Sequence, residues 1–213
     1  MKKSFAIFLC GFLSANVLAQ TPESRLFEAL ENNKPLVAEG IVARGAVNLD
    51  ARDATGETPL HRAIEKGYRE LAEMLVKAGA PLNARTKTGE VPLHLAALYE
   101  DTYFVDLLLV AKADVKARND EGESVLQWAV MTGNAKVTMH LLERGADWKV
   151  TDLKGDNLLH ACADGGYVEL AKALLSLGVD PRQRNREGKR PIDLARASGY
   201  GEIVKLLLRY EKE

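Results

Sequence analysis

The segment GETPLHRA, from Gly56 to Ala63, recurs along the chain and determines the fold that we expect. Related segments are GEVPLHLA at Gly89, GESVLQWA at Gly122, GDNLLHAC at Gly155 and GKRPIDLA at Gly188. Each start lies 33 residues after the one before it (89 − 56 = 33, and likewise for the others). A constant period of this length over most of a chain indicates an array of stacked units.

Each unit of the array is predicted to contain two short helices. In the first complete unit Thr58 is a suitable N-cap, and Pro59 fits the first helical position, where a missing N–H group costs nothing. Gly67 is expected to end the first helix and Gly79 the second. The apolar faces are predicted at Leu60, Ala63 and Ile64, and at Leu71, Met74 and Leu75. Helices of about ten residues are marginal alone in water, so neighbouring units must bury these faces together.

This pattern resembles the ankyrin repeat. The resemblance rests on TPLHRA, on the 33-residue step and on the endings KAGA and RGAD, and it covers Asp53 to about Tyr210. It implies an all-α solenoid, a curved stack of about six helix pairs whose connecting loops project as fingers. Residues 20–52 are expected to form a degenerate N-terminal capping repeat, and residues 53–213 an array of five units that includes a polar C-terminal cap.

The N-terminal residues 1–19 have the pattern of a cleaved signal peptide. Lys2 and Lys3 precede an apolar run from Phe5 to about Val17, and we expect cleavage after Ala19. The run is shorter than the ~20 residues that cross a bilayer, so a stable membrane anchor is not expected. We therefore predict a periplasmic protein, with secretion as the alternative.

Composition and charge limit the kinds of partner. The chain has 213 residues, of which 46% are apolar and 28% charged, so it can bury a core. Its formal charge of −1 provides no general attraction for nucleic acid or acidic lipid, and we expect no nucleic-acid partner. Removal of the signal peptide takes Cys10 with it, so that Cys162 has no cysteine left to pair with.

The histidines and Cys162 do not indicate catalytic or metal chemistry. His61, His94 and His160 share one position of the repeat, where the resemblance implies hydrogen bonds to local backbone and hydroxyl groups. One or more repeat spacings separate them, too far to share a metal ion whose nitrogen ligands lie at ~2.1 Å. Cys162 stands where other units have alanine, which predicts a packed thiol. We expect no enzyme activity, no metal and no cofactor.

Positions that differ between units predict a protein-binding surface. The middle units have apolar side chains where the end units have charged or very small ones, and acidic side chains lie nearby. An apolar centre with a polar rim is typical of interfaces, although single exposed apolar residues are also normal. The candidate binding residues are Lys87, Leu98, Tyr99, Asp101, Tyr103, Asp120, Glu121, Glu123, Met131, Leu153 and Lys154.

The third unit departs from the pattern at both of its turns. Glu100 stands where other units have Gly67, Gly133, Gly166 and Gly199. Lys112 stands where other units have Gly79 and Gly145, so both turns lack the residue that tolerates a positive φ at low cost. Either the turn is remodelled to present Tyr99, Asp101 and Tyr103 to a partner, or packed neighbours hold a poor turn at a cost of about 1 kcal/mol per site.

The function that we predict from these features is non-catalytic protein binding. The leading hypothesis is a periplasmic inhibitor or immunity protein that occludes the active site of an exported cell-envelope enzyme, such as a peptidoglycan peptidase or hydrolase. Two alternatives remain, a scaffold or stabiliser of a periplasmic complex, for example of an oxidative-stress enzyme, and a secreted effector that binds a host protein. The extended concave face of a repeat array would serve any of them.

Overall fold

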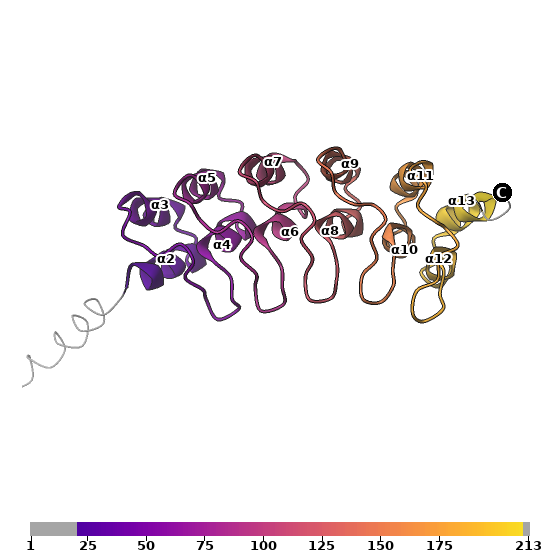
Figure 1. The fold of residues 1–213 in the computed structure, drawn as a ribbon, viewed down its shortest axis with the longest axis horizontal. Helices are drawn as coiled ribbons and strands as arrows, with labels where there is room; N and C mark the ends of the chain where they lie inside the picture. The colour runs from indigo at the N-terminus through magenta and orange to yellow at the C-terminus, as the bar shows by residue number, and fades with distance from the viewer. Residues whose placement is uncertain (1–20, 211–213) are drawn as a thin grey trace, which may run out of the picture.

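The computed structural model describes residues 21–210, which form six consecutive helix pairs (Figure 1). The predicted all-α repeat solenoid is confirmed for this part of the chain. The predicted signal peptide, residues 1–19, lies outside the described residues. In chain order the helices are α2 (Pro22–Glu31), α3 (Pro35–Ala43), α4 (Pro59–Glu65), α5 (Arg69–Lys77), α6 (Pro92–Ala96), α7 (Tyr103–Val110), α8 (Val125–Met131), α9 (Ala135–Glu143), α10 (Leu158–Gly165), α11 (Val168–Ser176), α12 (Pro191–Ala197) and α13 (Gly201–Tyr210).

The stack has three layers that run along its length (Figure 1). The second helices of the pairs, from α3 to α13, lie in a gently arched row, the first helices form the row beneath, and the finger loops project beyond them. We number the units by their helix pairs, so that the first is residues 21–52, the second 53–85, the third 86–118, the fourth 119–151, the fifth 152–184 and the sixth 185–210. The inner face is the surface formed by the fingers and by the exposed sides of the first helices.

The hydrophobic core is one continuous cluster that extends from Leu26 in α2 to Leu207 in α13. The second unit buries the predicted apolar faces, except that Met74 is only partly buried. Full burial of a leucine or isoleucine side chain stabilises a fold by roughly 1.5–3 kcal/mol. Because each helix pair buries these side chains against its neighbours, the units stabilise one another. No helix within residues 21–210 has the length and apolar character needed to cross a membrane.

The histidines at the start of the first helices link each unit to the next. The Nδ1 atom of His61 accepts a hydrogen bond from the Thr58 backbone N–H at 3.2 Å, so Nε2 carries the ring proton and donates to the carbonyl of Glu90 in the following finger at 3.3 Å. The same pair of contacts occurs at His94 and His160. Burial lowers the pKa of His61 to about 4, which keeps the ring neutral. The local backbone hydrogen bonds predicted for these three histidines are confirmed.

The fourth unit obtains the same link from an amide. Gln127 Oε1 accepts from the Ser124 N–H at 3.0 Å, and its Nε2 donates to the carbonyl of Asp156 at 3.2 Å. These two atoms reproduce the acceptor and donor of a neutral imidazole. Cys162 is buried in α10, where burial raises the pKa of its thiol to about 12, in accordance with the predicted packed side chain.

Candidate protein-binding surface

The structure divides the predicted binding residues between two places. The first group lies on the inner face and the second in the connection between α6 and α7. The inner-face group consists of Lys87, Leu98, Asp120, Glu121, Glu123, Met131, Leu153 and Lys154, and the α6–α7 group of Tyr99, Asp101 and Tyr103. The two groups therefore require separate descriptions.

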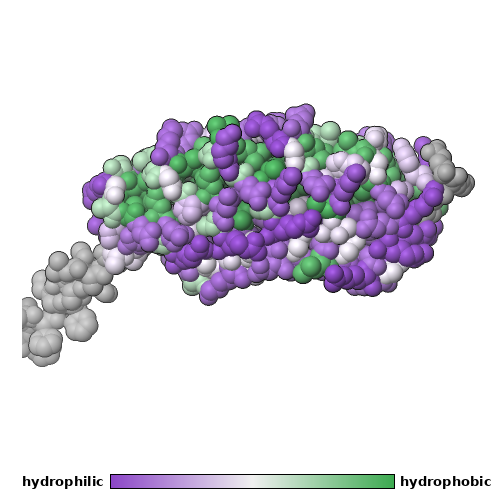
Figure 2. Space-filling model, in the orientation of Figure 1, coloured by the Kyte–Doolittle hydropathy of each residue, from purple (hydrophilic) through white to green (hydrophobic). Residues whose placement is uncertain are grey.

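Three apolar side chains of the inner-face group are open to solvent. Leu98, Met131 and Leu153 are 45%, 52% and 53% exposed. Leu98 follows α6, Met131 ends α8, and Leu153 lies in the fifth finger. Hydrophilic side chains dominate the finger edge of the molecule around an isolated hydrophobic patch, as Figure 2 shows. The three residues thus place apolar surface on three successive units of a largely polar face.

Charged side chains of the fingers connect one finger to the next. Asp120 accepts a hydrogen bond from Arg85 at 2.6 Å, and Glu121 pairs with Lys154 at 3.7 Å. Glu123 differs from its acidic neighbours, because its carboxylate accepts from the indole N–H of Trp128 at 2.8 Å and from Asn119 at 2.8 Å. Exposed acidic surface is therefore formed mainly by Asp120 and Glu121.

A ladder of arginines, which the sequence reasoning missed, also holds the fingers in register. Arg52 donates to the carbonyl of Arg85 at 2.5 Å, Arg85 to that of Arg118 at 2.6 Å, and Arg118 to that of Thr151 at 2.7 Å. The backbone adds one hydrogen bond per finger, such as Leu153 N–H to Glu121 C=O at 2.8 Å. Recurrence of arginine at the 33-residue step was the signal that could have revealed this ladder.

In the α6–α7 connection, Tyr99 takes over the role of a tyrosine that other units have two residues later. In the fifth unit Tyr167 donates its hydroxyl hydrogen bond to the carbonyl of Met131, at 3.0 Å, in the preceding unit. The third unit has Asp101 at the position of Tyr167 (167 − 101 = 66, two repeats). Tyr99 instead reaches the carbonyl of Glu65, which aligns with Met131, at 3.2 Å, and also that of Ile64 at 2.5 Å.

The neighbouring residues Asp101 and Tyr103 also connect the third unit to the second, through contacts between side chains. Asp101 forms an ion pair with Arg69, whose guanidinium lies 4.5 Å from the centroid of the Tyr103 ring. The Tyr103 hydroxyl donates to Glu73 at 2.5 Å. A binding role for Tyr99, Asp101 and Tyr103 remains a prediction, and all three also contribute to the joint between two units.

The two unusual turns of the third unit have different structures. Among residues 21–210, positive φ occurs outside glycine only at Asn33 and Lys112, so Glu100 does not adopt the left-handed conformation. Helix α6 ends at Ala96, earlier in its unit than α4 or α8, and the first turn is remodelled. Lys112 has a φ of 76°, so the second turn keeps the left-handed conformation with a lysine in place of glycine.

Comparisons with known proteins establish the class to which this helical array belongs. The family model described as ankyrin repeats, many copies, matches residues 41–96, and the model described as ankyrin repeats, three copies, matches residues 78–152 and 126–213. The chain therefore belongs to the ankyrin-repeat family. Ankyrin repeats mediate interactions between proteins and are generally non-catalytic. No curated protein matches the chain.

Metal chemistry has no support within the described part of the chain. Residues 21–210 contain no group of three or more histidine, cysteine, aspartate or glutamate side chains placed to hold a metal ion.

Proposed function

We propose that this protein binds an exported enzyme of the cell envelope through its inner face and occludes the active site of that enzyme. The observation that supports the proposal is the exposure of Leu98, Met131 and Leu153 on three successive units. In the position shared by Leu98 and Met131, the second and fifth units have Glu65 and Asp164. The apolar side chains are thus confined to the middle of the array, where a partner would exclude water from them.

The shape of the array supports a macromolecular partner. A standard interface buries about 800 Å² on each partner, which calls for a contact surface of several units. Rigid fingers joined by backbone and arginine hydrogen bonds would lose little conformational entropy when they bind. Export, as the N-terminal sequence suggests, would bring the array to enzymes of the periplasm, and a peptidoglycan peptidase or hydrolase is the target class that we propose.

The experiment begins with a chain that starts at Gln20 and is used to capture partners from a periplasmic extract. The captured enzyme is then purified and assayed with the array at an equimolar ratio. An inhibitor lowers the turnover of the enzyme, whereas a scaffold or stabiliser leaves turnover unchanged and lengthens the half-life of the enzyme. Recovery of the chain from the culture medium instead of the periplasm would favour the host-binding alternative.

A matched pair of variants tests whether the inner face carries the binding. Leu98→Glu combined with Met131→Glu is expected to weaken inhibition about 30-fold or more, because loss of a central apolar contact typically costs about 2 kcal/mol. Val110→Glu is the control, since Val110 is 71% exposed on the second helix of the same array. Equal loss in both variants, or no loss in either, would refute the proposed surface.

A further inference from the structure

The second unit contains an arginine that neutralises three carboxylates at once. The guanidinium of Arg62 lies 2.6 Å from Asp53, 2.8 Å from Glu57 and 2.9 Å from Glu65. Its side chain is 22% exposed, so the cation fills a partly enclosed position on the inner face. One planar group with several N–H donors can satisfy carboxylates that approach it from different directions.

The fifth unit keeps the three carboxylates and lacks the arginine. Asp152, Asp156 and Asp164 align with Asp53, Glu57 and Glu65 at a distance of three repeats (152 − 53 = 99, and likewise 156 − 57 and 164 − 65). The residue aligned with Arg62 is Ala161 (161 − 62 = 99). The third, fourth and sixth units have large apolar side chains at this position, namely Leu95, Trp128 and Leu194.

The small side chain of Ala161 coincides with a hollow of about 380 Å³ on the inner face. All three carboxylate residues line this hollow, together with Ala161. The apolar side chains of Met131 and Leu194 also line it, and the charged residues Glu123 and Lys154 border it. The fifth unit therefore presents apolar surface and carboxylates where the second unit presents a completed ion-pair network.

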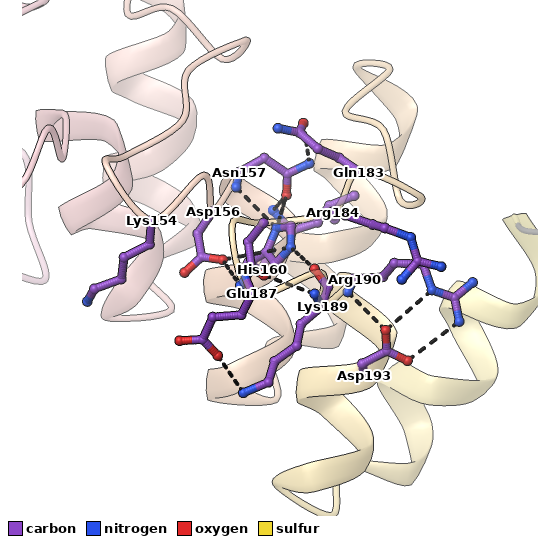
Figure 3. A network of polar contacts seen from close by, with 12 residues as sticks. Lys154, Asp156, Asn157, His160, Gln183, Arg184, Glu187, Lys189, Arg190 and Asp193 are labelled. Carbon is purple, nitrogen blue, oxygen red and sulfur yellow. Dashed lines mark hydrogen bonds and ion pairs between the residues drawn. The ribbon is translucent and has the colours of Figure 1, made fainter.

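The carboxylates of the hollow are held by neutral donors. Asp152 accepts from backbone N–H groups of its own finger, Asp164 from the Ser198 hydroxyl at 3.1 Å, and Asp156 from the Asn185 amide at 2.8 Å. Within residues 21–210, none of the three forms an ion pair with lysine or arginine. Figure 3 shows Lys154 extending away from Asp156, and its amino group lies 3.7 Å from Glu121.

The pKa values of the aligned residues Asp53 and Asp152 reflect this difference. For Asp53, burial acts to raise the pKa, but hydrogen bonds from Thr55 and Arg62 bring the pKa below its ordinary value. At Asp152 burial raises the pKa and the charge of Asp156 adds to this effect, so that the pKa stays above its ordinary value although backbone N–H groups and the charge of Lys154 act to lower it. The carboxylate of the fifth unit therefore lacks the hydrogen-bonded guanidinium that Arg62 provides in the second, and the charge of Lys154 compensates its burial only in part.

We propose that the hollow of the fifth unit receives an arginine side chain of the partner protein, whose guanidinium occupies the place that Arg62 occupies in the second unit. This inference rests on the proposed protein-binding function and specifies the chemistry of the partner. The methylene groups of the incoming arginine pack against Met131 and Leu194, while its N–H groups donate to the three carboxylates.

Methyl NMR tests the proposal directly. A chain labelled with ¹³C at its methionine methyl groups is titrated with N-acetyl-arginine N-methylamide and, separately, with the neutral isostere N-acetyl-citrulline N-methylamide. We expect a saturable shift of the Met131 resonance with the arginine probe only, and no shift at Met74, which lies in α5. Asp164→Asn should weaken the response about tenfold, because it removes one charged acceptor. Identical responses to the two probes would refute the proposal.

A second experiment compares the thermal stability of two variants and repeats the titration with one of them. Ala161→Arg restores the arrangement of the second unit, whereas Ala161→Leu fills the hollow with the apolar residue found at the aligned positions in the third and sixth units. We expect Ala161→Arg to have the higher Tm and to abolish the Met131 response. A Tm no higher than that of Ala161→Leu would show that the carboxylates do not favour a guanidinium. Either negative result leaves the enzyme-inhibition test unaffected, because that test measures the turnover of a captured enzyme and does not depend on the carboxylates of the hollow.

Discussion

The joint between the fourth and fifth units and the joint between the third and fourth solve the same packing problem differently. In the former, Gly133 has a φ of 71°, and a Cβ placed on it would lie 2.4 Å from the ring of Tyr167. In the latter, the aligned residues are Glu100 and Asn134, and the Asn134 amide donates to the carbonyl of Tyr99 at 2.7 Å. Glycine in the fourth unit therefore accompanies tyrosine in the fifth, whereas at the joint between the third and fourth units both are absent.

The largest effect that this comparison predicts is for Gly133→Ala. We expect it to lower the free energy of unfolding by about 3 kcal/mol, because the new Cβ imposes a strained positive φ and also collides with the Tyr167 ring. Urea denaturation followed by circular dichroism measures the change.

Glu100→Ala is the matched control for this substitution. Glu100 has no positive φ and is exposed, so the change should stay within about 0.5 kcal/mol of the wild type. Comparable losses for the two variants would contradict the pairing of glycine with tyrosine. A loss confined to Gly133→Ala would confirm that the third unit dispensed with its glycine at little cost.

A smaller effect is predicted for stability at acid pH, where the units that contain this histidine should differ from the fourth unit, which contains Gln127. Burial lowers the pKa of His61 to about 4, so the unfolded chain binds a proton near its ordinary pKa of 6.5 while the folded chain does not. Stability that is fully present above pH 6.5 is therefore lost as the pH falls toward 4. His61→Gln should reduce the loss between pH 7 and pH 4.5 by about 2 kcal/mol, since one pKa unit corresponds to about 1.4 kcal/mol.

The reciprocal variant sharpens the histidine comparison. Gln127→His introduces the same buried ring into the fourth unit, and it should steepen the acid sensitivity that His61→Gln relieves. Unfolding free energies of both variants at the two pH values give the difference, in which the titration of shared carboxylates cancels. Parallel pH profiles for wild type and His61→Gln would exclude a contribution from His61.

The sequence was sufficient for the fold because the 33-residue step repeats both the apolar positions and the helix ends. The local hydrogen bond of His61 could also be predicted, since Thr58 lies in the same unit, whereas its bond to Glu90 in the next unit could not. Residues whose partners lie in the adjacent unit were harder. Tyr99 aligns with no other tyrosine, and only the structure shows its hydroxyl at the carbonyl of Glu65.

Prediction of the candidate surface had a different limit, which lay in contacts within a single unit. The positions of Leu98, Met131 and Leu153 in the repeat indicated side chains facing outward, and their exposure agrees with that indication. Glu123 was predicted to be one of the acidic residues of this surface, although its carboxylate is held by Trp128 and Asn119. Position in a repeat predicts which face a side chain lies on, whereas its hydrogen-bond partners depend on the side chains that happen to surround it.

The smallest expected effect concerns the second turn of the third unit, where Lys112 occupies the place of Gly79 and Gly145. Lys112→Gly should raise the free energy of unfolding by about 1 kcal/mol, because a residue with a Cβ is strained at a φ of 76°. Thermal and urea unfolding measure the gain, which the greater freedom of glycine in the unfolded chain reduces.

Gly79→Lys provides the mirror experiment at this turn. A Cβ on Gly79 would meet no atom within 4 Å, so a loss of stability in this variant reports backbone strain, offset by the lower freedom of lysine in the unfolded chain, and no collision. The loss should be close in size to the gain from Lys112→Gly. The contrary outcome is that Gly79→Lys is destabilising while Lys112→Gly gives no gain in stability; in that case Lys112 must contribute an interaction that offsets its strain. The second turn of the third unit would then be specialised rather than merely tolerated.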